Sequence, residues 1–334
     1  METRKVQITG GSSYIVTLPK GWIEKNGIEA KDAVGIIEQR DGTILITPKD
    51  FKKQTYREKE FSLNGIQDPK YLFRLLIGAY MMGYSVLYLK SNRKIEPKFR
   101  NSIQKFVQAA IGFEIMEEDT NNLKLKDLMS PTEMPFANML DRLYLLVKNM
   151  HQDALTALST KNKDLANDII SRDDEVDKLY WLVARHSNIV LRNLIISKKS
   201  GVDPEEANFY YFISRIIERV GDHAVNIAKN IPKIITSKLD EKIIKKIKEA
   251  GLKASNIFEQ SIAIWNKGDK VKAHETIESI GSLDILCDEI NSIAVNIEGE
   301  VAIAIGYIVE SIRRTGDYSI NICEMTINHL VAQE

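Results

Sequence analysis

The C-terminal half of the chain carries one helical pattern twice, and this repeat limits the possible folds more than any other feature. Residues 218–227 align with residues 313–322, with identical Arg, Gly, Asp, Asn and Ile at matching positions. Residues 173–177 likewise match residues 284–288, and each of these shorter segments begins and ends with aspartate. A repeat of this length indicates that one structural unit is present twice.

Helical periodicity extends over the whole of this region. From about residue 136 onward, apolar residues recur at spacings of three and four, which is typical of helices with one buried face. Breaks in the pattern divide the region into six helices. We therefore predict an all-α C-terminal part with two consecutive three-helix bundles, at 135–235 and 238–332.

The two parts that precede the helices have a different character. Residues 1–50 combine alternating apolar residues, a Gly-Gly-Ser-Ser turn and an Arg-Asp-Gly hairpin signal, which predict a small β domain with one short helix. A unit of this size has too little core to be stable alone, so we expect it to form a dimer. Residues 55–130 alternate between strand and helix patterns and predict an α/β connecting domain, to which the sequence assigns no chemistry.

Acidic residues four positions apart mark the repeated helices. The pairs are 173/177, 218/222 and 284/288, and residues at this spacing share one helix face. Two such carboxylates repel each other, whereas a hard cation bound between them reverses the cost. A solvated acidic face is the alternative interpretation, and we prefer it for the pairs 114/118 and 164/168, which lie neither at matching positions of the two copies nor at the Gly-Asp motif. Gly221 and Gly316 precede aspartate in both copies and suggest close helix packing beside the carboxylates.

The duplicated Gly-Asp helix, the helix order and the segment Glu218–Ala228 resemble the PhoU family of phosphate-uptake regulators, over roughly residues 135–330. The resemblance implies bundles that bind multinuclear metal clusters, and it implies a regulator rather than an enzyme. It leaves open whether the metal is iron, manganese, magnesium or zinc. Carried over position by position, it implies as metal ligands Asp173, Asp177, Glu218 and Asp222 in one cluster, and Asp284, Asp288 and Asp317 in the other.

The second copy departs from the family pattern. Arg313 stands where the first copy has Glu218, and Glu310 lies one turn earlier as a partial substitute. The spacing between the acidic motif and Gly-Asp is also shorter in the second copy. We therefore expect the second site to hold fewer ions than the first, or none.

The N-terminal part resembles the SpoVT/AbrB swapped-hairpin domain over about residues 3–49. That family forms interleaved dimers, and many of its members bind DNA. Arg4, Lys5 and Lys20 are the candidate DNA contacts, because neutralisation of phosphates dominates DNA affinity. Surface lysines on a purely dimerising module are the alternative, since residues 1–53 hold nine Lys/Arg against seven Asp/Glu.

Several classes of protein are disfavoured by the sequence. The chain has 46 Lys/Arg and 46 Asp/Glu, so there is no overall charge bias toward nucleic acid or membrane. It lacks a signal-like apolar segment, a long apolar span and a CxxC motif, and we expect a cytoplasmic protein that is not integral to a membrane. No P-loop, HExxH or GxSxG motif is present. His223 and Cys287 lie near the acidic motifs. For His223 a core or helix-capping role is the alternative to metal ligation, and for Cys287 we prefer simple burial to ligation.

The leading hypothesis is a regulator of phosphate uptake and homeostasis, with a metal-binding helical part and a dimeric, DNA-binding head that acts on transcription. A first alternative is an adaptor that does not bind DNA and contacts a phosphate transporter or a sensor kinase. A second alternative, a metallohydrolase or oxidase, is disfavoured because no nucleophile, general base or ExxH motif can be assigned.

Overall fold

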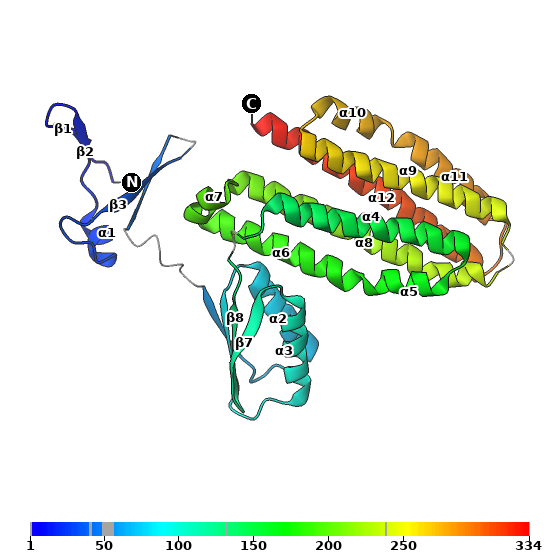
Figure 1. Cartoon of the computed structure of the whole chain (residues 1–334), viewed down its shortest axis with the longest axis horizontal. Helices are drawn as coiled ribbons and strands as arrows, with labels where there is room; N and C mark the ends of the chain where they lie inside the picture. The colour runs from blue at the N-terminus through cyan, green and yellow to red at the C-terminus, as the bar shows by residue number, and fades with distance from the viewer. Residues whose placement is uncertain (1, 40–41, 49–56, 131–132, 238, 334) are drawn as a thin grey trace. The chain divides into compact units, whose positions relative to one another are not determined.

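The computed structural model describes residues 2–39, 42–48, 57–130, 133–237 and 239–333. The chain divides into two compact units, residues 1–56 and residues 57–334 (Figure 1). The predicted fold class is confirmed: a small N-terminal β region is followed by a mixed α/β part and a long helical part.

The N-terminal unit consists of two short antiparallel hairpins and one helix. Its elements are β1 (Gln7–Thr9), β2 (Ser13–Ile15), α1 (Lys20–Lys25), β3 (Val34–Glu38) and β4 (Ile44–Pro48). Among its described hydrophobic side chains only Ile37 is buried. Large apolar side chains lie exposed on both hairpins, namely Val6, Ile8, Tyr14, Ile15, Val16, Ile36, Ile44 and Leu45. A single copy of this unit therefore lacks a hydrophobic core.

The second unit begins with a four-stranded sheet in the order β5-β6-β8-β7, whose helices α2 and α3 lie on one side of it (Figure 1). Only β5 and β6 are parallel, and the other neighbouring strands are antiparallel. The elements are β5 (Glu58–Ser62), α2 (Pro69–Met81), β6 (Val86–Lys90), α3 (Pro97–Ala109), β7 (Phe113–Glu118) and β8 (Asn122–Asp127).

Nine helices follow in the described residues beyond 133, where the sequence predicted six. They are α4 (Phe136–Thr160), α5 (Lys163–Ser171), α6 (Asp173–Arg192), α7 (Leu194–Ser200), α8 (Pro204–Ile235), α9 (Glu241–Lys267), α10 (Lys270–Glu278), α11 (Gly281–Ala294) and α12 (Glu300–Ala332). Each repeat has a divided middle helix, with the breaks at Arg172 and at residues 279–280. The remaining extra helix is α7, because Asn193 leaves the helical conformation and its side chain accepts hydrogen bonds from the first amides of α7.

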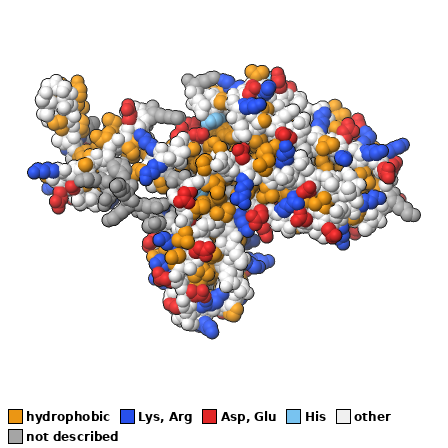
Figure 2. Space-filling model, viewed as in Figure 1, with side chains coloured by type: hydrophobic (Ala, Val, Ile, Leu, Met, Phe, Trp, Pro, Cys, Tyr) orange, Lys and Arg blue, Asp and Glu red, His pale blue; other side chains and the backbone are white. Residues whose placement is uncertain are grey.

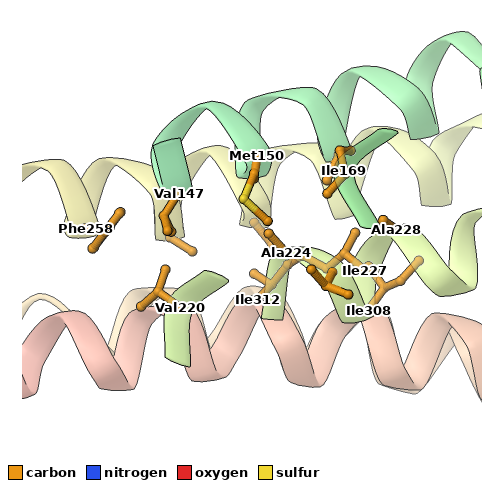
Figure 3. Close-up of a cluster of buried hydrophobic side chains, with 14 of the residues drawn as sticks. Val147, Met150, Ile169, Val220, Ala224, Ile227, Ala228, Phe258, Ile308 and Ile312 are labelled. Carbon is orange, nitrogen blue, oxygen red and sulfur yellow. The ribbon is translucent and has the colours of Figure 1, made fainter. Parts of the chain in front are cut away.

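The two repeats share one hydrophobic core rather than two separate ones. Figure 3 shows α4 and α8 of the first repeat packed against α9 and α12 of the second through Val147, Val220, Phe258 and Ile312. Acidic and basic side chains are interspersed over the outer face of these helices (Figure 2). No described helix is both long enough and apolar enough to cross a membrane.

A buried arginine joins the α/β part to the helices. Arg185 of α6 is 2% exposed, and its guanidinium donates to Asp127 at the end of β8 and to the carbonyls of Tyr80 and Tyr84 at 2.7 and 2.8 Å. Gly112 allows this arrangement, since a Cβ at that position would lie 2.6 Å from a carboxylate oxygen of Asp127. The connecting domain is thus fixed to the first repeat by a fully enclosed ion pair.

Candidate functional site

The first set of predicted ligands comes from two neighbouring helices. Asp173 and Asp177 lie in the first turns of α6, and Glu218 and Asp222 lie in the middle of α8. Gly221 lets these helices approach closely, because an added Cβ would meet Val176 of α6 at 3.3 Å. The close packing predicted from this glycine is therefore confirmed.

These four carboxylates influence one another. Burial and, after it, the neighbouring charge of Asp222 raise the pKa of Glu218 to about 7, although Arg215 opposes the shift. Burial, together with repulsion from Asp173 and Asp222, raises the pKa of Asp177 to about 6. The pKa of Asp173 is raised by burial and then by Asp222. Burial and mutual repulsion therefore disfavour the ionised forms of Asp173, Asp177 and Glu218.

Two arginines compensate this negative charge only in part. Arg215 contacts one oxygen of Glu218 at 2.7 Å, and Arg219 lies 3.9 Å from the other oxygen and 3.6 Å from Asp222. That second oxygen of Glu218, Oε2, is buried and has no hydrogen-bond partner. A buried carboxylate oxygen without a donor costs free energy, and a bound cation is one way to satisfy it.

The donor chemistry of this group fits a hard cation, since carboxylate oxygens are the ligands that such ions prefer. In the described part of the chain, however, no three His, Cys, Asp or Glu side chains are gathered so that they could hold one metal ion. Metal binding here would therefore require side-chain movement, with Arg215 leaving Glu218.

The second set is arranged around an arginine. Arg313 forms ion pairs with Asp284 and Asp288, at the position where the first repeat has Glu218. Arg314 contacts Glu310 at 2.9 Å and Asp317 at 3.5 Å. Gly316 again permits close packing, because its Cβ would lie 2.5 Å from Leu283. The second repeat thus keeps the backbone geometry of the first and neutralises its carboxylates internally.

The two other candidates face the protein interior. Cys287 is fully buried, and burial raises the pKa of its thiol to about 11, so it is an unreactive core residue. His223 is half-buried, and its ring lies 5.6 Å from the ring of Tyr318, the equivalent residue of the second repeat. The repeated segments therefore face each other through matching positions.

The predicted DNA contacts Arg4, Lys5 and Lys20 are all exposed on the N-terminal unit. Arg4 donates to Thr17 at 3.1 Å and pairs with Glu2, and Lys20 lies 3.6 Å from Glu24. Among the described residues, Lys5 has no such partner.

The sequence did not anticipate the Arg185–Asp127 pair, although a charged residue within the apolar stretch 179–190 was a signal for it.

Comparison with known families matches two separate parts of the chain. The family model of the PhoU domain matches residues 140–231. The family model named antidote-toxin recognition MazE, a bacterial antitoxin, matches residues 7–54. A PhoU homologue of the phosphate-specific transport system from Clostridium acetobutylicum is 28% identical over 192 residues, which cover 52% of this chain and 81% of that protein. A homologue with the same description from Thermotoga maritima is 25% identical over 202 residues, or 56% of this chain and 82% of its own length.

Structural comparison gives the same result for the helical part. The crystal structure of PhoU from Pseudomonas aeruginosa superimposes with a TM-score of 0.51 at 18% identity, covering 60% of this chain and 96% of that one. At this identity the likeness shows the fold alone. The relatives are described as accessory proteins of transport and not as enzymes. The chain therefore contains a PhoU domain, matched over residues 140–231, that follows an N-terminal domain of the MazE/AbrB type.

Proposed function

We propose that this protein regulates phosphate uptake as an accessory factor whose helical part responds to a metal-loaded state and whose head acts on DNA. The observation that carries the proposal is the agreement of the helical part with proteins described as accessory to phosphate-specific transport, over more than four-fifths of their length. Deleting the gene in its host tests this role. We expect phosphate uptake or transporter expression to lose its dependence on external phosphate, and an unchanged response would contradict the proposal.

The metal part of the proposal concerns Asp173, Asp177, Glu218 and Asp222. These four carboxylates are partly buried, and Arg215 and Arg219 pair with only two of them. The group is best suited to bind a hard divalent or trivalent cation. When bound, such an ion would supply the positive charge that Arg215 and Arg219 provide incompletely. Arg313 already supplies that charge in the second repeat, so we assign resident metal to the first site.

The head is proposed to form a dimer and to bind DNA. Its exposed apolar hairpins need a second copy to cover them, since an isolated small domain with one buried hydrophobic residue has no adequate core. A dimer would also double the exposed cations Arg4, Lys5 and Lys20. Gel retardation of the upstream DNA of its own gene across a salt series tests this part, with a steep loss of binding expected as salt rises.

The adaptor remains the second candidate, in which the head only dimerises and the helical part contacts a transporter or a sensor kinase. Ion pairs at Arg4 and Lys20 favour it, because they already occupy two of the three proposed DNA contacts. A dimer that does not retard DNA even at low salt, yet retains phosphate-dependent regulation, would decide for the adaptor.

A further inference from the structure

The two helices of the connecting domain carry positive charge without any acidic residue. α2 and α3 together contain Lys70, Arg74, Lys98, Arg100 and Lys105, and neither helix contains Asp or Glu within its bounds. Arg100 is compensated by Glu118 and by the carbonyl of Asp119. The other four cations are exposed. In a chain whose total charge is balanced, this is a local concentration of positive charge.

These four cations line one hollow between the two helices. Its volume is about 370 Å³, and its wall also includes Phe73 and Ser102 but no acidic side chain. Lys70 and Arg74 are one helical turn apart, and Lys98 and Lys105 are two turns apart, so each pair presents its charges along one helix face. Lys98 pairs with Glu96 at 3.0 Å, whereas the side chains of the other three have no ion pair or hydrogen bond to any described residue.

More positive charge lies on the loops that lead into these helices. A second hollow of about 460 Å³ follows the ends of the parallel strands β5 and β6, and Arg93 and Lys94 belong to its wall. Neither of these side chains has a partner among the described residues. The ends of parallel strands are where α/β proteins commonly place their ligands. Asp68 and Glu96 are the only acidic residues that flank the first turns of α2 and α3.

This arrangement fits a compact ligand with several negative charges. Four cations around one small space repel each other, and a multiply charged anion would reverse that cost. The hollow has the size of a small-molecule site, and its cations surround a space between helices rather than following an extended surface as a nucleic-acid track does. The half-buried ring of Phe73 provides an apolar wall against which a planar group could pack.

We propose that the hollow between α2 and α3 binds a chain of linked phosphates, as found in a nucleoside triphosphate or in inorganic polyphosphate. Lys70, Arg74, Lys98 and Lys105 contact the phosphate oxygens, and Phe73 contacts the base when a nucleotide is bound. The connecting domain is thereby a ligand-binding module in its own right, distinct from the carboxylates of the first repeat.

Calorimetric titration of the full chain with ATP, tripolyphosphate and orthophosphate tests the proposal. We expect ATP or tripolyphosphate to bind at 150 mM salt and orthophosphate to bind at least about tenfold more weakly, because each charged hydrogen bond is worth about a factor of ten or more. The double variant Lys70→Ala/Lys105→Ala should weaken binding at least about tenfold. Lys245→Ala/Lys248→Ala is the matched control, since these are also exposed helical lysines without described partners, and it should bind as the wild type does.

The probes also separate the two sources of linked phosphates. Equal affinity for ATP and tripolyphosphate would show that the linked phosphates alone account for binding. Stronger binding of ATP would show that the base also contributes to the affinity. The proposal is overturned by the absence of binding at 50 mM salt, or by binding that the α2/α3 variant leaves unchanged. It is also overturned if the variant loses its affinity for duplex DNA but keeps its affinity for linked phosphates.

Discussion

Replacing Glu218 by Gln in the metal-free protein should stabilise it. Burial and Asp222 raise the pKa of Glu218 from 4.5 to about 7. A carboxyl with a raised folded-state pKa binds more protons folded than unfolded between these two values, so stability falls as pH rises from 4.5 to 7 and stays reduced above. A shift of this size corresponds to at most about 3 kcal/mol, and loss of the half-exposed Arg215 contact offsets part of it. We therefore expect Glu218→Gln to gain about 2 kcal/mol at pH 8.

Thermal unfolding with a chelator present measures this effect. A gain of about 2 kcal/mol corresponds to a rise in Tm of roughly 4–8 °C for a unit of this size. At pH 5 the wild-type carboxyl is mostly protonated when folded, so the difference between the two proteins should be small. Glu249→Gln, an exposed residue of α9 without a described ion pair, is the control and should change Tm little at either pH. A Glu218→Gln protein that is less stable than wild type at pH 8, or a difference independent of pH, would refute the reasoning.

Three further changes probe other parts of the molecule. Arg185→Met should destabilise the protein by about 3–5 kcal/mol, measured by urea unfolding, because it leaves Asp127 buried without its partner; a loss below about 1 kcal/mol would contradict the role given to this pair. Burial lowers the pKa of His151 to about 4, so the unfolded chain binds an extra proton between pH 6.5 and 4 and stability should fall on acidification by up to about 1.4 kcal/mol per pH unit. His151→Gln should weaken that dependence in pH-resolved unfolding, and an unchanged slope would exclude His151 as its source. Arg313→Glu removes the cation beside Asp288, so Mn²⁺ should raise the Tm of this variant more than that of wild type; an equal rise would show that Arg313 does not block the second site.

Much of the fold could be predicted because its signals are local. The α8 start follows from Asp203 as N-cap and Pro204 in the first turn, and the α9 end from Gly268 in the left-handed region. The repeat also located both groups of carboxylates and the glycines beside them. The divided middle helices were missed because Arg172 at the first break keeps helical dihedral angles and interrupts no apolar pattern.

Long-range contacts were not predictable from the same signals. Asp127 and Arg185 lie 58 positions apart on different elements, and nothing local to either one identifies its partner. The common core of the two repeats was not predicted for the same reason. Apolar periodicity shows that a helix face is buried, but it does not show which helix covers that face. The hollow between α2 and α3 required the packing of two helices that each lack a distinctive motif. Arg313 was the exception, because alignment of the two repeats by itself places this cation among the carboxylates of the second copy.

Our central proposal is that the first repeat holds metal through its incompletely compensated carboxylates and that the second repeat does not. Elemental analysis of natively purified protein tests it most directly, with Asp177→Asn/Glu218→Gln compared with Asp284→Asn/Asp288→Asn. We expect bound iron, manganese, magnesium or zinc in wild type and in the second-repeat variant, and its loss in the first-repeat variant. Wild-type protein without metal, or equal loss of metal in both variants, would contradict the account.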